Sequence, residues 1–167
     1  DQELYRSIVK ALREQEVATT RIRSAHGGIV ADLARHPALL AADLEPEAIA
    51  GWFEGGGADD ERFAIEVVTT DPDGTLLLRR TERHTGAVET ISLAAVVFSG
   101  QAYTALRRSH ARLLELVGPG PFHVAQGRKE LDAVGHAALR SGIFECCKEG
   151  LEISRFKGLG EMNAEQL

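Results

Sequence analysis

The residues best suited to chemistry lie near the C-terminal end of the sequence. The stretch runs Ile153-Ser154-Arg155-Phe156-Lys157-Gly158-Leu159-Gly160-Glu161-Met162-Asn163. A strand here would place Arg155 and Lys157 on one face, because alternate residues of a strand share a face. Gly158 and Gly160 permit the close backbone approach that a phosphate or another chain requires. The stretch thus predicts an anion site. Its parts would be a strand, a cation, a Gly-x-Gly turn and the start of a helix capped by Asn163. A plain glycine turn between a strand and a helix explains the same pattern.

A second basic cluster, Arg107, Arg108 and Arg112, falls within a helical pattern over residues 103–117. Three cations on one helix are suited to contacts with phosphates. They are equally typical of the solvated back of an amphipathic helix. Glu115 shares this region, which favours the solvated face.

The strongest metal-like motif is Asp71-Pro72-Asp73-Gly74, because an Asp-x-Asp spacing can place two carboxylates on one Mg²⁺. The motif separates two strand-like runs, and a turn accounts for its proline and glycine as well. The six histidines are scattered and no zinc-type spacing occurs. The adjacent Cys146 and Cys147 are expected to be reduced and partly buried. The sequence therefore predicts a turn, no metal site and no complete catalytic constellation.

Composition and charge indicate a globular protein and argue against several other classes of protein. The 167 residues are 44% hydrophobic and 26% charged, as in globular proteins. The net charge of −6 argues against a free-standing nucleic-acid-binding protein. Residues 99–167 hold nine Lys/Arg against eight Asp/Glu, so this third is the part expected to meet a polyanion. The longest apolar runs, such as residues 93–98, are too short to cross a bilayer. No apolar signal segment opens the sequence, which predicts a cytoplasmic protein. The sequence starts at Asp1 without a Met, which predicts a processed or excised piece.

Helical patterns come first along the chain and strand patterns follow. Apolar residues at three-to-four spacing predict helices over residues 4–23, 29–35 and 46–53. Gly55-Gly56-Gly57 marks an internal boundary. Runs rich in β-branched residues and leucine then predict strands over residues 63–70, 75–83 and 87–98. Tight turns between them predict a three-stranded antiparallel meander.

The remaining third mixes both patterns. Two further helices are predicted over residues 103–117 and 130–148, on either side of a short strand over 122–125. Gly142 within the second helix indicates close packing or a break. A last strand is predicted over 151–156, and a helix begins at 164–167. The fold class is therefore α+β.

Residues 155–163 resemble the Arg-Tyr/Phe-Lys-Gly-Leu-Gly-Glu-Met-Asn signature at the end of the Toprim domain of bacterial type IIA topoisomerases. The B subunits of DNA gyrase and of topoisomerase IV carry this signature. Residues 1–150 resemble the insertion that precedes it in many Gram-negative gyrase B subunits. The resemblance divides these residues into a helical part (1–57), a strand-rich part (58–98) and a mixed part (99–150), followed by the C-terminal piece of the Toprim domain over 151–167. The last strand would then belong to the Toprim sheet and form an edge in this chain.

The resemblance implies a parent enzyme that supercoils DNA negatively by ATP-dependent double-strand passage. Its partners would be double-stranded DNA and the gyrase A subunit, which carries the tyrosine that bonds to DNA, in an A2B2 assembly without a membrane. ATP and Mg²⁺ would be held by other parts of the parent, so this chain is expected to bind no cofactor and no metal. No residue here is expected to be catalytic, and the chain alone is expected to be inactive.

The resemblance also implies candidate contacts with DNA or the partner subunit. Arg155 and Lys157 would supply charge, and Gly158 and Gly160 would permit close approach. Glu161 would pair with one of these cations or lie near the metal. Phe156 stands where the family often has tyrosine, so a hydroxyl contact is lost.

Two roles remain open. The first is a non-catalytic scaffold that couples parts of the enzyme and supports DNA binding, and the acidic charge of residues 1–98 suits it. The second is a direct DNA- or phosphate-binding module that uses Lys157-Gly158-Leu159-Gly160 and the Arg107/Arg108/Arg112 helix. The salt dependence of any DNA binding distinguishes the two.

Overall fold

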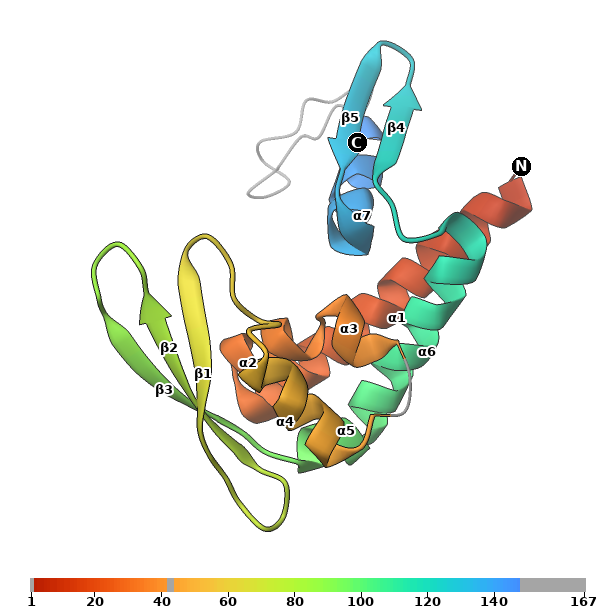
Figure 1. The fold of residues 1–167 in the computed structure, drawn as a ribbon. Coiled ribbons are helices and arrows are strands. Elements are labelled where there is room, and N and C mark those ends of the chain that lie inside the picture. Colours follow the sequence, from red (N-terminus) through yellow and green to blue (C-terminus); the bar gives the residue numbers. More distant parts are fainter. Residues whose placement is uncertain (1, 42–43, 148–167) are drawn as a thin grey trace, which may run out of the picture. The chain divides into compact units, whose positions relative to one another are not determined.

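The computed structural model describes residues 2–41 and 44–147 (Figure 1). These residues form seven helices, a three-stranded antiparallel sheet and a two-stranded sheet. The predicted α+β class is therefore confirmed. Contacts divide the chain into two compact units, Asp1–Pro119 and Gly120–Leu167. The predicted boundary between residues 150 and 151 lies outside the described residues.

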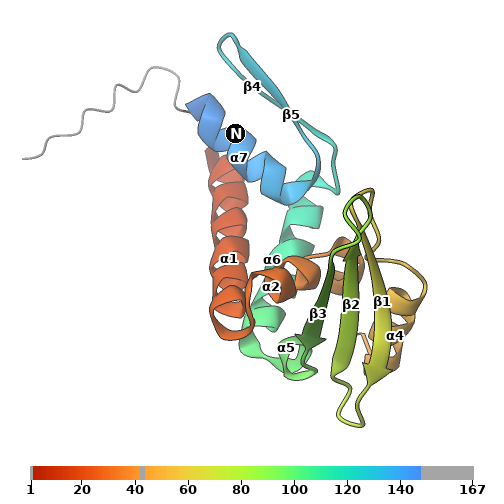
Figure 2. The ribbon, with the colours of Figure 1, turned by 90° about the vertical axis from the view of Figure 1, so that its left-hand side faces the viewer.

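Two long helices form one side of the first unit. Helix α1 (Gln2–His26) packs along α6 (Gln101–Val117), as Figures 1 and 2 show. Both helices are amphipathic, and their apolar stripes face the core. The buried apolar residues of the pair are Ala11, Leu12, Ala18, Ile22, Tyr103, Leu106 and Leu113. Both helices end at a glycine of positive φ, Gly27 and Gly118. The helices predicted over 4–23 and 103–117 are confirmed.

Three short helices follow α1. They are α2 (Gly28–Ala34), α3 (Pro37–Leu40) and α4 (Pro46–Glu54). The sequence predicts α2 and α4 but not α3, because its pattern gives Pro37 only the role of ending α2. Pro37 instead occupies the first turn of α3. Backbone N–H groups of a first turn have no partner within the helix, so the missing N–H of proline costs no hydrogen bond there. His36 caps this turn, since its Nδ1 accepts a hydrogen bond of 3.3 Å from the backbone N–H of Ala38.

The three-stranded sheet runs in the order β1-β2-β3, as predicted (Figure 2). Its strands are β1 (Phe63–Thr70), β2 (Leu76–Glu82) and β3 (Val88–Leu93). Leu78 of β2 lies opposite Val67 of β1 and Ile91 of β3. Alternation along the strands places the buried residues Ile65, Leu76, Leu78, Ile91 and Leu93 on one face. Helix α4 packs against β1 and α2 against β3.

The third strand is shorter than predicted. It ends at Leu93, and residues Val96–Ser99 form helix α5. The prediction over 87–98 was wrong here because periodicity does not separate strand from helix in a short apolar run. Val97 is buried, and the Phe98 ring meets the Tyr103 ring edge-on at 5.1 Å between centroids. The apolar run thus joins the sheet to α6.

The second unit is a hairpin against a helix. Strands β4 (Phe122–Gln126) and β5 (Lys129–Ala133) pair, and α7 (Gly135–Cys147) packs on both. The strand predicted over 122–125 is confirmed. The helix predicted from residue 130 was wrong at its start. Gly127, with φ of 62°, and Arg128 form a two-residue turn that sends the chain back as β5. Val134, which the helical pattern placed inward, is 85% exposed.

Helix α7 runs without interruption through Gly142. This glycine is buried, and a Cβ on it would lie 3.4 Å from Val124 Cγ2. Of the two predicted alternatives, the break is absent from the described helix, and the contact with Val124 is of ordinary van der Waals length. Cys146 is buried near the carbonyl of Val124 and Cys147 is half-buried, and neither is joined in a disulfide within the described residues. The elements predicted over 151–156 and 164–167 lie outside the described residues.

Candidate functional site

The first set of predicted site residues lies outside the described part of the chain. These residues are Arg155, Lys157, Gly158, Gly160 and Glu161. The second set, the three arginines of α6, lies within it. The charged side chains of α6, of the three-stranded sheet and of the β4–β5 hairpin lie within the described residues. Their geometry shows which of them are available to contact DNA or another protein.

The α6 arginines have three different environments. Arg108 and Arg112 are exposed, four residues apart on the helix face opposite the core, whereas Arg107 is half-buried. The guanidinium Nη1 of Arg112 lies 3.0 Å from Glu115 Oε2. No carboxylate among the described residues forms an ion pair with Arg108. This arrangement supports the interpretation of the three arginines as part of a solvated helix face.

Arg107 lies beside a structural tyrosine. The hydroxyl of the buried Tyr103 donates a hydrogen bond to the carbonyl of Leu39, which fixes α6 to α3. Burial raises the pKa of Tyr103 to about 12, and the positive charge of Arg107 opposes this rise. The phenol therefore stays protonated at neutral pH and acts as a fixed donor.

Each arginine of the three-stranded sheet and its turns has an acidic partner. The pairs, with their nitrogen–oxygen distances, are Arg62–Glu82 (3.1 Å), Arg79–Glu66 (2.6 Å), Arg80–Glu89 (2.6 Å) and Arg83–Asp59 (3.2 Å). Exposed ion pairs contribute little stability. They do neutralise the cations, so this sheet offers no unpaired basic patch to a phosphate backbone.

The charge of the first unit is unevenly distributed. Helix α1 carries five Lys/Arg against three Asp/Glu, and α6 carries three against one. Residues 27–100, which lie between them in the chain, carry five against thirteen. A polyanion meeting this unit would be attracted to α1 and α6 and repelled by the remaining elements.

The Asp71–Gly74 motif forms the predicted turn. The backbone N–H of Gly74 donates to the carbonyl of Asp71 at 2.9 Å, and Gly74 has a φ of 84°. Asp73 Oδ1 accepts a 2.9 Å hydrogen bond from the backbone N–H of Thr75. This bond, together with one from the Thr75 hydroxyl, lowers the pKa of Asp73. Among residues 2–41 and 44–147 no group of three or more His, Cys, Asp or Glu side chains could hold a metal ion.

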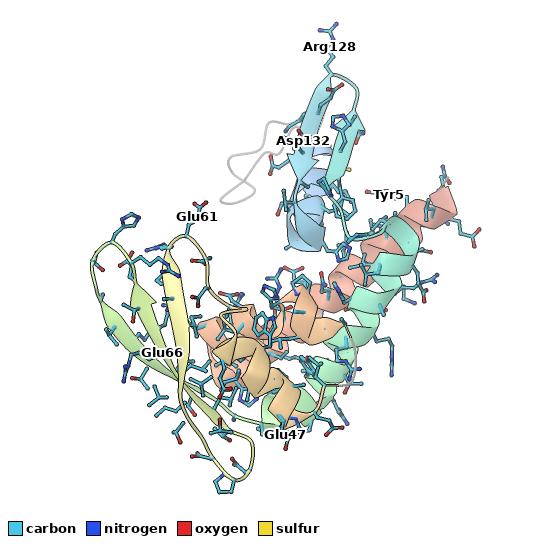
Figure 3. The ribbon with its side chains drawn as sticks, viewed as in Figure 1. Tyr5, Glu47, Glu61, Glu66, Arg128 and Asp132 are labelled. Carbon is cyan, nitrogen blue, oxygen red and sulfur yellow. The ribbon has the colours of Figure 1, made fainter. Side chains whose placement is uncertain are left out.

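A charge pair on the β4–β5 hairpin was not predicted. His123 Nδ1 lies 2.9 Å from Asp132 Oδ1 across the strands, and His123 Nε2 lies 3.9 Å from Glu130 Oε2. The hydrogen bond with Asp132 raises the pKa of the exposed His123. Arg128 stands at the tip of the same hairpin, as Figure 3 shows. The sequence signal is the Gln126-Gly127-Arg128 turn, which sets the strand register and brings His123 opposite Asp132.

None of the helices that the structure describes is both long and apolar enough to cross a membrane.

Comparisons with known proteins find similarity over a short stretch. No family model matches the sequence. The B subunit of DNA gyrase from Rickettsia typhi is 56% identical over 39 residues. The corresponding proteins of Rickettsia conorii and Rickettsia bellii are 51% and 49% identical over 39 residues. Each match covers 23% of this chain and 5% of the relative. The chain thus shares a short segment with gyrase B subunits and spans a small part of their length.

Proposed function

We propose that this chain is a segment of the B subunit of DNA gyrase and serves there as a non-catalytic scaffold that supports DNA binding. The 49–56% identity to Rickettsia gyrase B subunits over 39 residues carries the proposal. The Arg155–Asn163 signature points to the same family. In this proposal the working enzyme is an A2B2 topoisomerase that supercoils duplex DNA, and it binds ATP and Mg²⁺ through parts outside this chain.

Within that enzyme, residues 1–150 would form the insertion and residues 151–167 the end of the Toprim domain. The charge distribution supports a scaffold over a DNA grip for most of the insertion. Residues 27–100 carry a large acidic excess, and the arginines of the three-stranded sheet are paired with carboxylates. Such a surface repels a phosphate backbone and suits contact with protein. Contacts with DNA or the A subunit are then assigned to Arg155, Lys157, Gly158, Gly160 and Glu161.

One observation favours a second candidate role, direct DNA binding by this chain. Arg108 is exposed on α6 without an acidic partner among the described residues, and α1 and α6 together carry a basic excess. A duplex lying along these two helices would meet that excess. Lys157-Gly158-Leu159-Gly160 would provide a further anion contact in this role.

Binding of the full chain to labelled duplex DNA, measured by anisotropy from low to physiological salt, separates the roles. A scaffold is expected to bind weakly with little salt dependence, whereas a module that neutralises several phosphates loses affinity steeply as salt rises. Three double variants locate any binding. They are Arg155→Gln with Lys157→Gln, Arg107→Gln with Arg108→Gln, and the matched control Arg62→Gln with Arg79→Gln at the three-stranded sheet.

Tight, salt-sensitive binding lost only in the Arg107/Arg108 variant would establish the second role. Loss in the Arg155/Lys157 variant alone would make the signature a direct DNA contact. Equal loss in all three would indicate attraction by net charge without a defined site.

The assignment to gyrase needs its own test. The longer protein that contains this chain is mixed with the gyrase A subunit, ATP, Mg²⁺ and relaxed plasmid. Negative supercoils that require both subunits and ATP are expected. Relaxation without ATP-dependent supercoiling would contradict the proposal.

A further inference from the structure

Two adjoining hollows lie around the start of α4 in the first unit. The first, of about 480 Å³, has mainly apolar walls that include Leu44, Ile49, Val96 and Phe98. The second, of about 400 Å³, runs along α4 and the β1–β2 turn. The hollows share Pro46, Asp73 and Gly74, so they form one groove, named here the α4 groove.

The two halves of the α4 groove differ in chemistry. In the apolar half, Val96 leaves 59% of its surface exposed. The other half is lined by four carboxylates, those of Glu47, Glu54, Asp71 and Asp73. Figure 3 shows Glu47 at the beginning of α4. No Lys, Arg or His is among the described residues that line either half.

The groove carboxylates contrast with those of the neighbouring sheet. Glu66, Glu82 and Glu89 each pair with an arginine. None of the four groove carboxylates forms an ion pair with a cation in the described part of the chain. The groove thus combines an exposed apolar wall with carboxylates that no cation among the described residues pairs with. A ligand that supplies both an apolar side chain and positive charge would complement it.

We propose that the α4 groove binds a basic, amphipathic segment of another protein. An apolar side chain of that segment fills the half lined by Val96 and Phe98, and lysines or arginines lie along Glu47, Glu54 and Asp71. The combined size of the two halves is in the range of ligand-binding clefts and accommodates a few side chains. The acidic lining excludes nucleic acid and anionic lipid as occupants. This proposal does not depend on the assignment to gyrase.

A second copy of this chain is the main competing occupant, because α1 and α6 are basic. The groove and these helices are different surfaces of one unit, so contact between copies would be head-to-tail. Head-to-tail contacts close into rings or grow into open filaments. A separate basic partner would fill the groove without forming rings or filaments of this chain. We therefore assign the groove to such a partner.

The test uses the full chain and a fluorescein-labelled synthetic peptide of leucine and lysine patterned as an amphipathic helix. Anisotropy is measured for the wild type, for Val96→Asp, and for Glu47→Gln with Glu54→Gln. The matched control, Glu14→Gln with Glu16→Gln, removes two carboxylates from the exposed side of α1. All substituted side chains are exposed, and circular dichroism verifies that each variant is folded.

The proposal predicts that the peptide binds the wild type and that a peptide with glutamate in place of lysine does not. Loss of Glu47 and Glu54 is expected to weaken binding roughly three- to tenfold, as for two exposed charge pairs. Val96→Asp is expected to weaken it by about tenfold or more, and the control to change it less than about twofold.

Three results would overturn the proposal. The peptide could fail to bind, or the control could weaken binding as much as the groove variants. Alternatively, sedimentation could show self-association that Val96→Asp abolishes, which would make a second copy the occupant.

Discussion

The indole of Trp52 lies directly over the backbone of Gly57. A Cβ on Gly57 would be 2.3 Å from both Nε1 and Cε2 of Trp52, closer than atoms can approach. The same indole contacts the His36 imidazole at 4.6 Å and the Phe53 ring at 4.9 Å between centroids. Since Phe53 is fully buried in the core, Gly57 allows the chain after α4 to fold back over this aromatic group.

Substitution of Gly57 by alanine should therefore destabilise the first unit. The added methyl group displaces the indole or the backbone, and overpacking of this kind costs about 1–3 kcal/mol. Denaturant unfolding followed by fluorescence measures the effect, because Trp52 is the single tryptophan. Gly51→Ala is the matched control. Gly51 lies within α4 with open space around it, so alanine there should stabilise by about 0.5–1 kcal/mol. Equal effects at the two positions would contradict the packing argument.

His36 should make the stability of the fold depend on pH below neutrality. Burial lowers the pKa of His36 from its ordinary value of 6.5. The folded protein thus favours neutral imidazole, whose Nδ1 accepts the hydrogen bond from Ala38. The contribution is present above pH 6.5 and is lost as pH falls through the lowered pKa. Asparagine also caps helices and does not titrate, so His36→Asn should lose less stability than wild type between about pH 7 and 5. If the unfolding free energies of the wild type and of His36→Asn changed with pH in parallel, His36 would not be the source of the pH dependence.

His123 should respond to pH with the opposite sign. Its pKa is raised, first by the hydrogen bond with Asp132 and then by the charges of Asp132 and Glu130. Its contribution to stability is present below pH 6.5 and is lost as pH rises through the raised pKa. Titration of the imidazole resonances by NMR should show a clear fall in pKa in Asp132→Asn. Glu130→Gln, the matched control at a longer distance, should lower it less. A larger effect from Glu130 would contradict the register of β4 and β5.

The sequence predicted most elements of the first unit because their signals are local. Amphipathic spacing marks α1 and α6, and the Asp71–Gly74 turn separates β1 from β2. The errors occurred where local signals conflict. The run from Leu93 to Phe98 suits a strand or a helix, and packing beside Tyr103 decides in favour of α5. Residues after 129 suit a helix by spacing, but the turn at Gly127 makes β5 the partner of β4.

The site was less predictable than the fold, since it depends on contacts between distant segments. The alternation in β4 and β5 does not show that His123 faces Asp132 until the register is known. The α4 groove joins residues of α4, the β1–β2 turn and α5, and α5 was predicted as strand. The charges of the arginine cluster on α6 were evident in the sequence, whereas the partnership of Arg112 with Glu115 became evident only in the structure.

Gly142 provides a test of the packing between α7 and the β4–β5 hairpin. A Cβ at this position would be in ordinary contact with Val124 at 3.4 Å. Gly142→Ala should therefore stabilise α7 by up to about 1 kcal/mol, because alanine favours helix and the methyl group fits. Gly142→Leu should instead cost about 1–3 kcal/mol, since its larger side chain must displace Val124. Hydrogen exchange of the α7 amides measures both effects within this unit. Stabilisation by both substitutions would show that the hairpin does not pack closely on α7.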